Sequence, residues 1–246
     1  MKLENAVVLV TGANGGLGGH WIQGLHNTGV SKIYACARNT QKLNNIVTTD
    51  PQKIVAVELD ISDETSIAKA AAQCSDVTLL INNAGILFNQ GFIASKDLSA
   101  ARTEIEINYF GTLAMCRAFA PILKMNGGGA IINMLTILAK VNLPANGSYC
   151  AAKAATFSMT QGVRAELANQ GTLVIGVMPA TVDTGMSKDY PTPKVSPVEV
   201  VREALQAVVN GVEDVYPGEQ AKDLAAQLLS DPKAVEKALA QMLPMS

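Results

Sequence analysis

Short apolar runs rich in Val, Ile and Leu alternate along the chain with longer helical stretches. Each run is too continuous for a strand that has one face in water, so both of its faces are expected to be buried. The runs are Ala6–Val10, Lys32–Ala37, Ile54–Glu58, Val77–Asn82, Ala130–Met134 and Leu173–Met178, with a weaker one at Asp214–Tyr216. Buried strands that alternate with helices predict a parallel sheet whose strands are joined by right-handed crossovers.

The helices between these runs carry start signals. The segment Ser62-Asp63-Glu64 can cap a helix that runs through Ala72, and Ser196-Pro197-Val198-Glu199 combines an N-cap serine with proline at the first helical position. A further helix is expected over Thr103–Met125. Because no internal repeat or Pro/Ser-rich linker divides the chain, residues 1–246 are expected to form one doubly wound, Rossmann-like α/β domain with helices on both faces of the sheet.

The longest stretch without a clear helix or strand pattern runs from Pro179 to Pro197 and is rich in proline. It follows the carboxyl end of a predicted strand, which is where ligands bind in such sheets. A loop of this length in this position is more often a lid than a spacer. A substrate lid is therefore predicted at about residues 180–197.

Composition and charge narrow the kind of partner. A chain of 246 residues with 48% hydrophobic content can bury a large core. The net charge is −2 and no cluster of Lys and Arg is present, so neither nucleic acid nor an anionic membrane is indicated, and a small molecule is the expected partner. The apolar run near the N-terminus is too short for a signal peptide, which favours a soluble, cytoplasmic protein.

Cysteine and histidine are too sparse for several common chemistries. The four cysteines lie more than thirty residues apart, so they form neither a C-x-x-C redox pair nor a zinc cluster and are typical of buried thiols in a reducing compartment. His20 and His26 are the only histidines and both lie near the N-terminus. We therefore expect no metal site and no histidine-based nucleophilic catalysis.

A glycine-rich turn follows the first predicted strand and precedes an amphipathic helix. Glycines in this position let the backbone approach a pyrophosphate, and the helix N-terminus offers free N–H groups and partial positive charge. An ordinary tight turn or an S-adenosylmethionine site would share part of this pattern, but the strand–turn–helix context favours a dinucleotide. The candidate cofactor-binding residues of this turn are Gly12, Asn14, Gly15, Gly16, Leu17 and Gly18.

The end of the second predicted strand indicates which dinucleotide binds. An acidic residue there would accept a hydrogen bond from a free ribose 2′-hydroxyl, whereas this chain has Ala37-Arg38-Asn39. The Arg38 guanidinium can instead hold a 2′-phosphate with forked, charge-assisted hydrogen bonds, unless it is simply a surface arginine. The sequence thus favours NADP(H) over NAD(H).

The helical stretch from Ser148 to Gln161 contains the best candidate for acid–base chemistry. Tyr149 and Lys153 are four residues apart, so their side chains leave the same face of a helix. A cation beside a phenol favours the phenolate, so we expect the pKa of Tyr149 to be lowered. The spacing alone is weak evidence because it also occurs by chance.

Taken together, the motifs resemble the classical short-chain dehydrogenase/reductase family over essentially the whole chain. Their shared order and spacing carry the resemblance. They are TGANGGLG at 11–18, LDI at 59–61, NNAG at 82–85, Asn108 in NYFG, Thr136 thirteen residues before Tyr149, Tyr149-x-x-x-Lys153, and Pro179 followed by Val182 and Thr184. The resemblance implies nicotinamide-dependent interconversion of an alcohol and a carbonyl by a homo-oligomer, either a dimer or a tetramer.

The resemblance also implies roles for residues outside the glycine turn. Asp60 and Ile61 would flank the adenine, and Asn83, Ala84 and Gly85 would run beside the cofactor. Pro179, Val182 and Thr184 would lie near the nicotinamide, where Val182 and Thr184 would contact its carboxamide. These are the remaining cofactor-binding candidates, together with Tyr149 and Lys153.

Reduction of a ketone needs hydride at carbon and a proton at oxygen, and the oxygen gains negative charge in the transition state. Tyr149 can deliver the proton, while Lys153 can tune its pKa and hold the ribose hydroxyls. Thr136 would donate a hydrogen bond to the substrate oxygen. Asn108 resembles the family residue that anchors a water linking Lys153 to solvent, although on its own it would be expected to be a solvent-facing helix amide.

Three positions depart from the family pattern. Thr136 replaces the usual serine and keeps the hydroxyl but adds a methyl group and a stiffer χ1 angle. Gly15 stands where many NADP-dependent members have a basic residue, which leaves Arg38 as the main argument for the phosphate. Ala180 replaces the glycine that commonly follows Pro179, at little expected cost. Every group that the chemistry needs is present.

The residues expected around the substrate are mostly apolar, which favours a hydrophobic or aryl ketone or aldehyde unless they serve as core or subunit contacts. They are Leu138, Leu143, Phe88, Phe92, Met186 and Tyr190. One alternative enzyme is a 3-oxoacyl-carrier-protein reductase, but the turn lacks the usual Ser-Arg before Gly16. A non-catalytic dinucleotide-sensing protein on the same fold is the alternative from another class.

Overall fold

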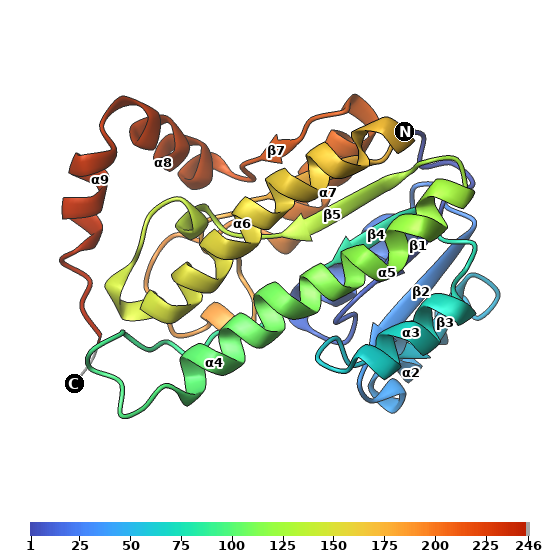
Figure 1. The fold of residues 1–246 in the computed structure, drawn as a ribbon, viewed down its shortest axis with the longest axis horizontal. Coiled ribbons are helices and arrows are strands. Elements are labelled where there is room, and N and C mark those ends of the chain that lie inside the picture. The colour runs from blue at the N-terminus through green and yellow to red at the C-terminus, as the bar shows by residue number, and fades with distance from the viewer. Residues whose placement is uncertain (245–246) are drawn as a thin grey trace.

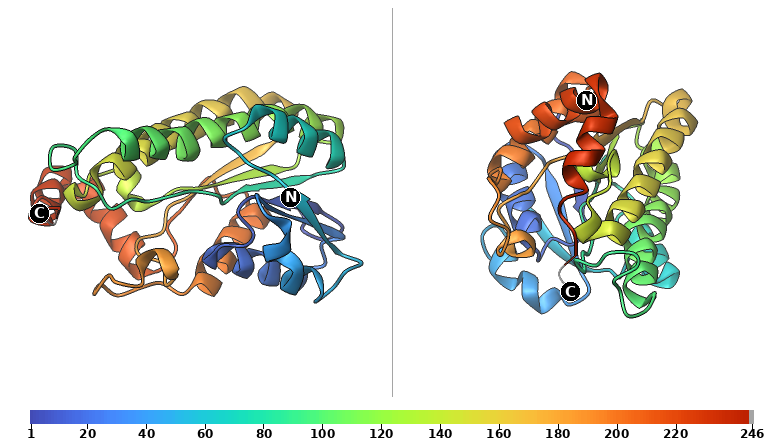
Figure 2. Two further views of the ribbon diagram at one scale, coloured as in Figure 1. Left: turned by 90° about the horizontal axis from the view of Figure 1, so that it is seen from below. Right: turned by 90° about the vertical axis from the view of Figure 1, so that its left-hand side faces the viewer.

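The computed structural model describes residues 1–244 as a parallel sheet between two layers of helices (Figure 1, Figure 2). The seven strands of these residues pair in the order β3-β2-β1-β4-β5-β6-β7, and every pairing is parallel. The strands are β1 (Val7–Val10), β2 (Lys32–Ala37), β3 (Ile54–Glu58), β4 (Leu79–Asn82), β5 (Ala130–Met134), β6 (Leu173–Val177) and β7 (Asp214–Val215). The predicted Rossmann-like fold and all seven predicted strands are confirmed, with ends that differ by two residues at most.

The helices cover both faces of the sheet, as Figure 2 shows. They are α1 (Gly16–His26), α2 (Asn44–Val47), α3 (Glu64–Gln73), α4 (Ser99–Ile105), α5 (Thr112–Met125), α6 (Gly147–Leu167), α7 (Pro197–Asn210), α8 (Glu219–Ser230) and α9 (Pro232–Leu239). The side chains of Asp63 and Ser196 accept the capping hydrogen bonds of α3 and α7, as the start signals predicted. Pro197 is the first residue of α7.

Two apolar clusters form the core, one on each face of the sheet. On one face, Trp21 and Leu25 of α1 pack with Val200 of α7 against alternate residues of the strands. On the other, Phe119 of α5 packs with Ile67 of α3 and the remaining alternate residues. The apolar side chains of the strands alternate between the two clusters, so the strands are buried on both faces and the apolar runs in the sequence are nearly continuous.

One predicted helix differs from its prediction in a way that matters for the site. The helix that was expected to begin at Thr103 begins at Ser99, and α4 continues into α5 through a π-helical segment, Glu106–Gly111. A π-helical segment widens the turn and changes which residues face the sheet, and such segments are frequent at functional sites. Asn108 lies in the middle of this one.

The carboxyl ends of β1 and β4 lie at the point where the strand order reverses. The chain leaves β1 toward β2 and β3 on one side, and later elements extend the sheet from β4 on the other. Ligands of doubly wound sheets bind in the crevice that forms at such a point. The glycine turn follows β1 and the NNAG segment follows β4, so the topology brings the two motifs together.

Candidate active site and dinucleotide cradle

The glycine turn between β1 and α1 leaves room only for backbone at three places. A Cβ atom at Gly18 would lie 2.2 Å from the Gly12 carbonyl oxygen, one at Gly12 would lie 3.0 Å from the Cα atom of Ala84, and one at Gly16 would lie 3.1 Å from the Cβ atom of Thr184. Gly12 also has a φ of +64°, which favours glycine. Only glycine therefore fits at these three positions, and the backbone of the turn can approach a pyrophosphate closely.

The N-terminus of α1 has its N–H groups available for a ligand. Its N-cap residue is Gly15, which has no side chain to accept a hydrogen bond, and its first turn contains no acidic residue. Free N–H groups and the positive end of the helix dipole favour a phosphate there. The residues of this turn thus fit a dinucleotide on geometric and electrostatic grounds.

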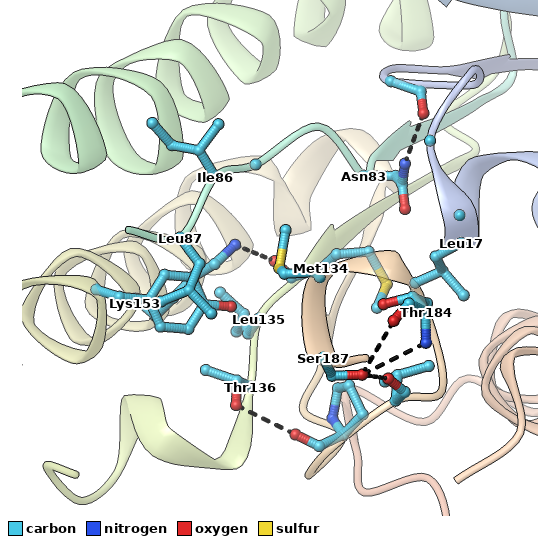
Figure 3. Close-up of a pocket in the computed structure, with 18 of the residues that line it drawn as sticks. Leu17, Asn83, Ile86, Leu87, Met134, Leu135, Thr136, Lys153, Thr184 and Ser187 are labelled. Atoms are coloured by element: carbon cyan, nitrogen blue, oxygen red, sulfur yellow. Dashed lines mark hydrogen bonds between the residues drawn. The ribbon is translucent and has the colours of Figure 1, made fainter. Parts of the chain in front are cut away.

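The NNAG segment after β4 holds the glycine turn in place. The Thr11 hydroxyl accepts hydrogen bonds from the backbone N–H groups of Asn83 at 3.0 Å and Ala84 at 2.9 Å. The side-chain amide of Asn83 donates to the carbonyl oxygens of Thr11 and Gly12 at 2.9 and 3.3 Å (Figure 3). Sequence reasoning did not assign a role to Thr11, because its contacts are made only when β1 and β4 become neighbours.

Arg38 and Asp60 lie at the carboxyl ends of neighbouring strands and line the same cavity as the glycine turn, together with Ile61. Hydrogen bonds from the hydroxyl and the backbone N–H of Ser62, at 2.7 and 3.0 Å, lower the pKa of the Asp60 carboxyl, and the nearby positive charge of Arg38 lowers it further. Asp60 is thus an anionic acceptor at the predicted adenine end. The exposed Arg38 guanidinium lies at the predicted ribose end.

Tyr149 and Lys153 lie in the first two turns of α6, and both line the cavity. Figure 3 shows the Lys153 side chain there. The Lys153 Nζ atom lies 5.8 Å from the centroid of the Tyr149 ring and donates a hydrogen bond to the Met134 carbonyl oxygen at 2.8 Å. Burial lowers the pKa of Lys153 to about 8. The two groups therefore share one space, as the four-residue spacing predicted.

The expected lowering of the Tyr149 pKa is wrong for the protein without a cofactor. Burial is the largest cause of a raised pKa, and the charges of Cys150, Glu104 and Tyr190 act in the same direction. The prediction considered the neighbouring ammonium alone, whereas removal from water disfavours the phenolate more strongly. A raised pKa keeps the phenol protonated at neutral pH, and a protonated phenol is the form that can donate a proton.

Thr136 faces the same cavity and caps the 3₁₀ turn Ile137–Ala139. Its hydroxyl donates to the Pro179 carbonyl oxygen at 3.2 Å and accepts from the backbone N–H of Leu138 at 3.3 Å (Figure 3). To donate to a substrate oxygen, the hydroxyl must turn away from Pro179. The hydroxyl at this position is thus present, but its proton is engaged in the protein without substrate.

Asn108 is fully buried, so the expectation of a solvent-facing amide is wrong. Its side chain accepts a hydrogen bond from the Ile86 N–H at 3.1 Å and donates one to the Ile86 carbonyl at 3.0 Å. Its main-chain carbonyl accepts hydrogen bonds from the hydroxyls of Thr112 and Thr156 at 2.8 and 3.0 Å. Asn108 therefore fixes the loop that follows NNAG, while its role in anchoring a water stays a prediction.

The segment after Pro179 has more structure than the sequence indicated. Val182 and Val195 form a parallel bridge, and a 3₁₀ turn spans Gly185–Ser187. Thr184 is the N-cap residue of this turn, and its backbone N–H donates a hydrogen bond to the Ser187 hydroxyl at 3.4 Å (Figure 3). Val182 and Thr184 line the cavity as predicted, whereas movement of the segment as a lid stays a prediction.

Tyr190 connects the segment to the opposite side of the cavity. Its hydroxyl accepts a hydrogen bond from the Asn146 side chain at 3.2 Å and donates one to the side-chain oxygen of Asn89. Asn146 lies just before α6, and Asn89 lies in the loop after β4. The segment 180–197 thus spans the site from β6 to the catalytic helix.

One cavity of about 580 Å³ is lined by the glycine turn and by Arg38, Asp60, Thr136, Tyr149, Lys153 and Tyr190, whereas Asn108 does not line it. Of the predicted substrate-side residues, Leu138, Leu143, Met186 and Tyr190 line it. Phe88 and Phe92 do not line it; both rings are about half exposed, and that of Phe92 lies against Gly147 at the start of α6. The lining also includes four C-terminal residues that sequence reasoning missed, namely Gln220, Leu224, Leu239 and Met242.

The C-terminal segment reaches this cavity by folding back over it. The Met242 carbonyl oxygen accepts a hydrogen bond from the Ala145 N–H at 3.0 Å, next to the start of α6. Pro244 lies so close to Gly91 that a Cβ atom at Gly91 would come within 2.4 Å of the proline ring. Figure 1 shows the C-terminal end beside the loop that follows β4. No local pattern of residues predicts this return of the chain.

The fold and the glycine turn together define a Rossmann-type fold with a dinucleotide-binding motif, and a tyrosine and a lysine line the same cavity. The family model described as short chain dehydrogenase matches residues 6–194. This chain therefore belongs to the classical short-chain dehydrogenase/reductase family.

Known proteins of the family resemble the chain to different extents. It is 45% identical to a short chain dehydrogenase from Burkholderia cenocepacia J2315 solved in complex with NADP, with a TM-score of 0.92, covering 97% of this chain and 99% of that one. A short-chain dehydrogenase from Sphingobium yanoikuyae in complex with NADPH is 25% identical, with a TM-score of 0.78, and the match covers 92% of this chain and 96% of that one.

A curated relative is Dehydrogenase/reductase SDR family member 7B of Rattus norvegicus, which is 33% identical over 198 residues. The match covers 75% of this chain and only 60% of that protein. Within residues 1–244, no helix is long and apolar enough to cross a membrane. The same residues contain no cluster of His, Cys, Asp and Glu side chains that could hold a metal ion.

Proposed function

We propose that this protein is an NADP(H)-dependent reductase or dehydrogenase that interconverts a hydrophobic or aryl ketone or aldehyde and its alcohol. The observation that carries the proposal is the convergence of Tyr149, Lys153 and Thr136 on one cavity that also contains the glycine turn. A bound nicotinamide would supply or accept the hydride. The chain's own residues must supply the proton and position the carbonyl.

Tyr149 serves as the proton donor in reduction and as the proton acceptor in oxidation. Its phenol is protonated at neutral pH, since the ordinary pKa of tyrosine is about 10 and burial raises it further. Thr136 donates a hydrogen bond to the substrate oxygen, where negative charge develops, and such a donor contributes about a hundredfold or more to a rate. Lys153 holds the ribose hydroxyls and, once charged, stabilises the phenolate that remains after proton transfer.

Arg38 supports the choice of NADP(H). It is a cationic side chain at the ribose end of the cavity, and no acidic residue stands at positions 36–39 to repel a 2′-phosphate. The relative that is 45% identical was solved with NADP. An apolar lining that includes Leu138, Met186 and Leu239 supports an apolar substrate over a sugar or a charged acyl carrier.

The test is a panel of ketones, aldehydes and alcohols assayed by nicotinamide absorbance, with NADPH and NADH in parallel. We expect turnover of apolar carbonyls with NADPH and a loss of at least about a thousandfold in kcat for Tyr149→Phe, which removes only the ionisable hydroxyl. A Tyr149→Phe variant that turns over every accepted substrate at the wild-type rate would refute the proposed mechanism. Light scattering would show whether the chain forms the dimer or tetramer expected from its family.

A further inference from the structure

Glu104 is a buried carboxyl group that the proposed reaction does not use. It lies on α4 one helical turn before Asn108, and its side chain is fully shielded from solvent. One oxygen accepts a hydrogen bond from the Phe88 backbone N–H at 2.8 Å, and the other accepts one from the Ser148 hydroxyl at 2.5 Å. Since burial of a carboxyl group is costly unless both oxygens are satisfied, these two contacts explain how Glu104 is tolerated.

The first contact extends the clamp that Asn108 makes on the loop after β4. Asn108 holds Ile86 through both of its backbone groups, and Glu104 holds Phe88 two residues further along. Four residues of helix advance about 6 Å, and two residues of extended chain advance about 6.6 Å, so the two side chains match the loop in spacing. The stretch from Gly85 to Leu87 lines the cavity, so this clamp sets the position of one cavity wall.

The second contact reaches the catalytic helix. Ser148 is buried and directly precedes Tyr149 in the first turn of α6. Figure 1 shows α4 beside the N-terminal end of α6, where this contact is made. A single carboxyl group thus joins the loop on one side of the cavity to the turn that carries Tyr149 on the other.

We propose that Glu104 is a positioning residue that couples the loop at residues 85–88 to the first turn of α6 and so fixes Tyr149 relative to the substrate carbonyl. This inference rests on the proposed function, because it assigns the coupling a role in catalysis. A displacement of about 1 Å between reacting groups can cost about a hundredfold in rate, so a small loosening of the connection is measurable.

The charge of Glu104 provides a readout that packing alone would not. After burial and the charge of Cys150, the carboxylate contributes to the raised pKa of Tyr149, together with Tyr190. Lys153 is the cation that faces the same phenol. Removal of the Glu104 charge should lower the pKa of Tyr149 and shift the pH profiles of reduction and oxidation toward lower pH.

The test compares three substitutions, Glu104→Gln, Glu104→Ala and Ser148→Ala, by kcat, KM, pH profile and NADPH dissociation constant. Glutamine keeps a hydrogen-bonding group at both contacts without the charge, so we expect its kcat to stay within about fivefold of wild type while its pH profile shifts downward. Alanine removes both contacts, and we expect kcat to fall by about 30-fold or more with little change in NADPH affinity.

Ser148→Ala should lower kcat and leave the KM of the substrate nearly unchanged, because it removes only the contact to the catalytic helix. Glu106→Ala is the matched control, since Glu106 lies two residues further along the same helix and is exposed. We expect wild-type kinetics for that variant.

Wild-type kcat and an unshifted pH profile in both Glu104 variants would overturn the inference. So would a Glu104→Ala variant that melts at a lower temperature but keeps wild-type kcat below its transition. If Glu104→Ala does not fold, the Gln and Ser148→Ala variants decide.

Hydrogen exchange separates this inference from the proposed function. If the wild type turns over no carbonyl, the proposed function fails, but the coupling is still measurable at the Phe88 amide and the first turn of α6. Faster exchange at both places in Glu104→Gln or Ser148→Ala than in Glu106→Ala would support the coupling. Equal exchange in all variants would overturn it.

Discussion

Replacement of Arg38 by alanine should weaken NADPH binding and leave NADH binding unchanged. Arg38 follows the buried end of β2 and lines the cavity beside Asp60. A hydrogen bond between a guanidinium and a phosphate contributes about 1.5–3 kcal/mol, and exposure to solvent places this contact near the lower end of that range. Since about 1.4 kcal/mol corresponds to tenfold in affinity, we expect the dissociation constant of NADPH to rise by roughly 10- to 30-fold.

The assay is a fluorescence titration of each dinucleotide with wild type and Arg38→Ala at low and high salt, supported by steady-state KM values. Lys42→Ala is a suitable control, because Lys42 is an exposed cation a few residues away that does not line the cavity. It removes the same charge without touching the proposed phosphate site. Ala37→Asp, which places a carboxylate beside Arg38, should shift the preference toward NADH.

Two results would refute this reasoning. Equal losses of NADPH and NADH affinity in Arg38→Ala would mean that Arg38 contacts a part common to both cofactors, or only supports the fold. A wild-type protein that prefers NADH would show that the missing acid after β2 does not set the specificity of this chain.

Three further perturbations test other parts of the site. Thr136→Ser should retain most activity, while Thr136→Val should lower kcat by about a hundredfold or more, because only valine removes the hydroxyl. Equal rates in kinetic assays of wild type and both variants would show that Thr136 has no role in the reaction. Gly18→Ala should raise the NADPH dissociation constant by at least about a hundredfold, because its Cβ atom would lie 2.2 Å from the Gly12 carbonyl oxygen. Gly19→Ala is the control in the same titration. It should bind NADPH normally, because its Cβ atom would meet nothing within 4 Å. Burial lowers the pKa of Lys153 from the ordinary 10.5 to about 8. Between these two pH values the unfolded chain binds more protons than the folded chain. The contribution of Lys153 to the free energy of unfolding should therefore rise with pH in that window. In chemical denaturation between pH 8 and 10, the free energy of unfolding of wild type should rise by about 2 kcal/mol relative to that of Lys153→Met. A difference that does not change with pH would contradict the assigned burial of the ammonium.

The elements that the sequence predicted well are those whose signal is local. The strands could be predicted because burial on both faces leaves a continuous apolar run, as in Leu79–Asn82 and Ala130–Met134. The caps at Asp63 and Ser196 could be predicted because the capping side chain and its backbone partner lie two residues apart. The glycine turn could be predicted because its motif lies within eight consecutive residues, 11–18.

The site residues that sequence reasoning missed depend on contacts between distant parts of the chain. Leu239 and Met242 resemble ordinary surface-helix residues until the chain folds back over the cavity. Glu104 is a charged residue in an amphipathic helix, where an exposed position is the usual expectation, and only its partners Phe88 and Ser148 reveal why it is buried. The phenyl ring of Phe92 was expected in the cavity, but it covers Gly147 from outside.

The same distinction explains why the pKa of Tyr149 was predicted in the wrong direction. The four-residue spacing to Lys153 is a local fact and correctly predicts a shared space, but the pKa depends on how much water the surrounding chain excludes. Burial favours the neutral form of both groups, raising the pKa of Tyr149 and lowering that of Lys153. A neutral phenol can donate a proton to a carbonyl oxygen, whereas accepting a proton from an alcohol requires the phenolate. We therefore expect the proposed reduction to proceed at neutral pH, where Lys153 with a pKa of about 8 is mostly charged, and the proposed oxidation to need a higher pH, at which the phenol ionises.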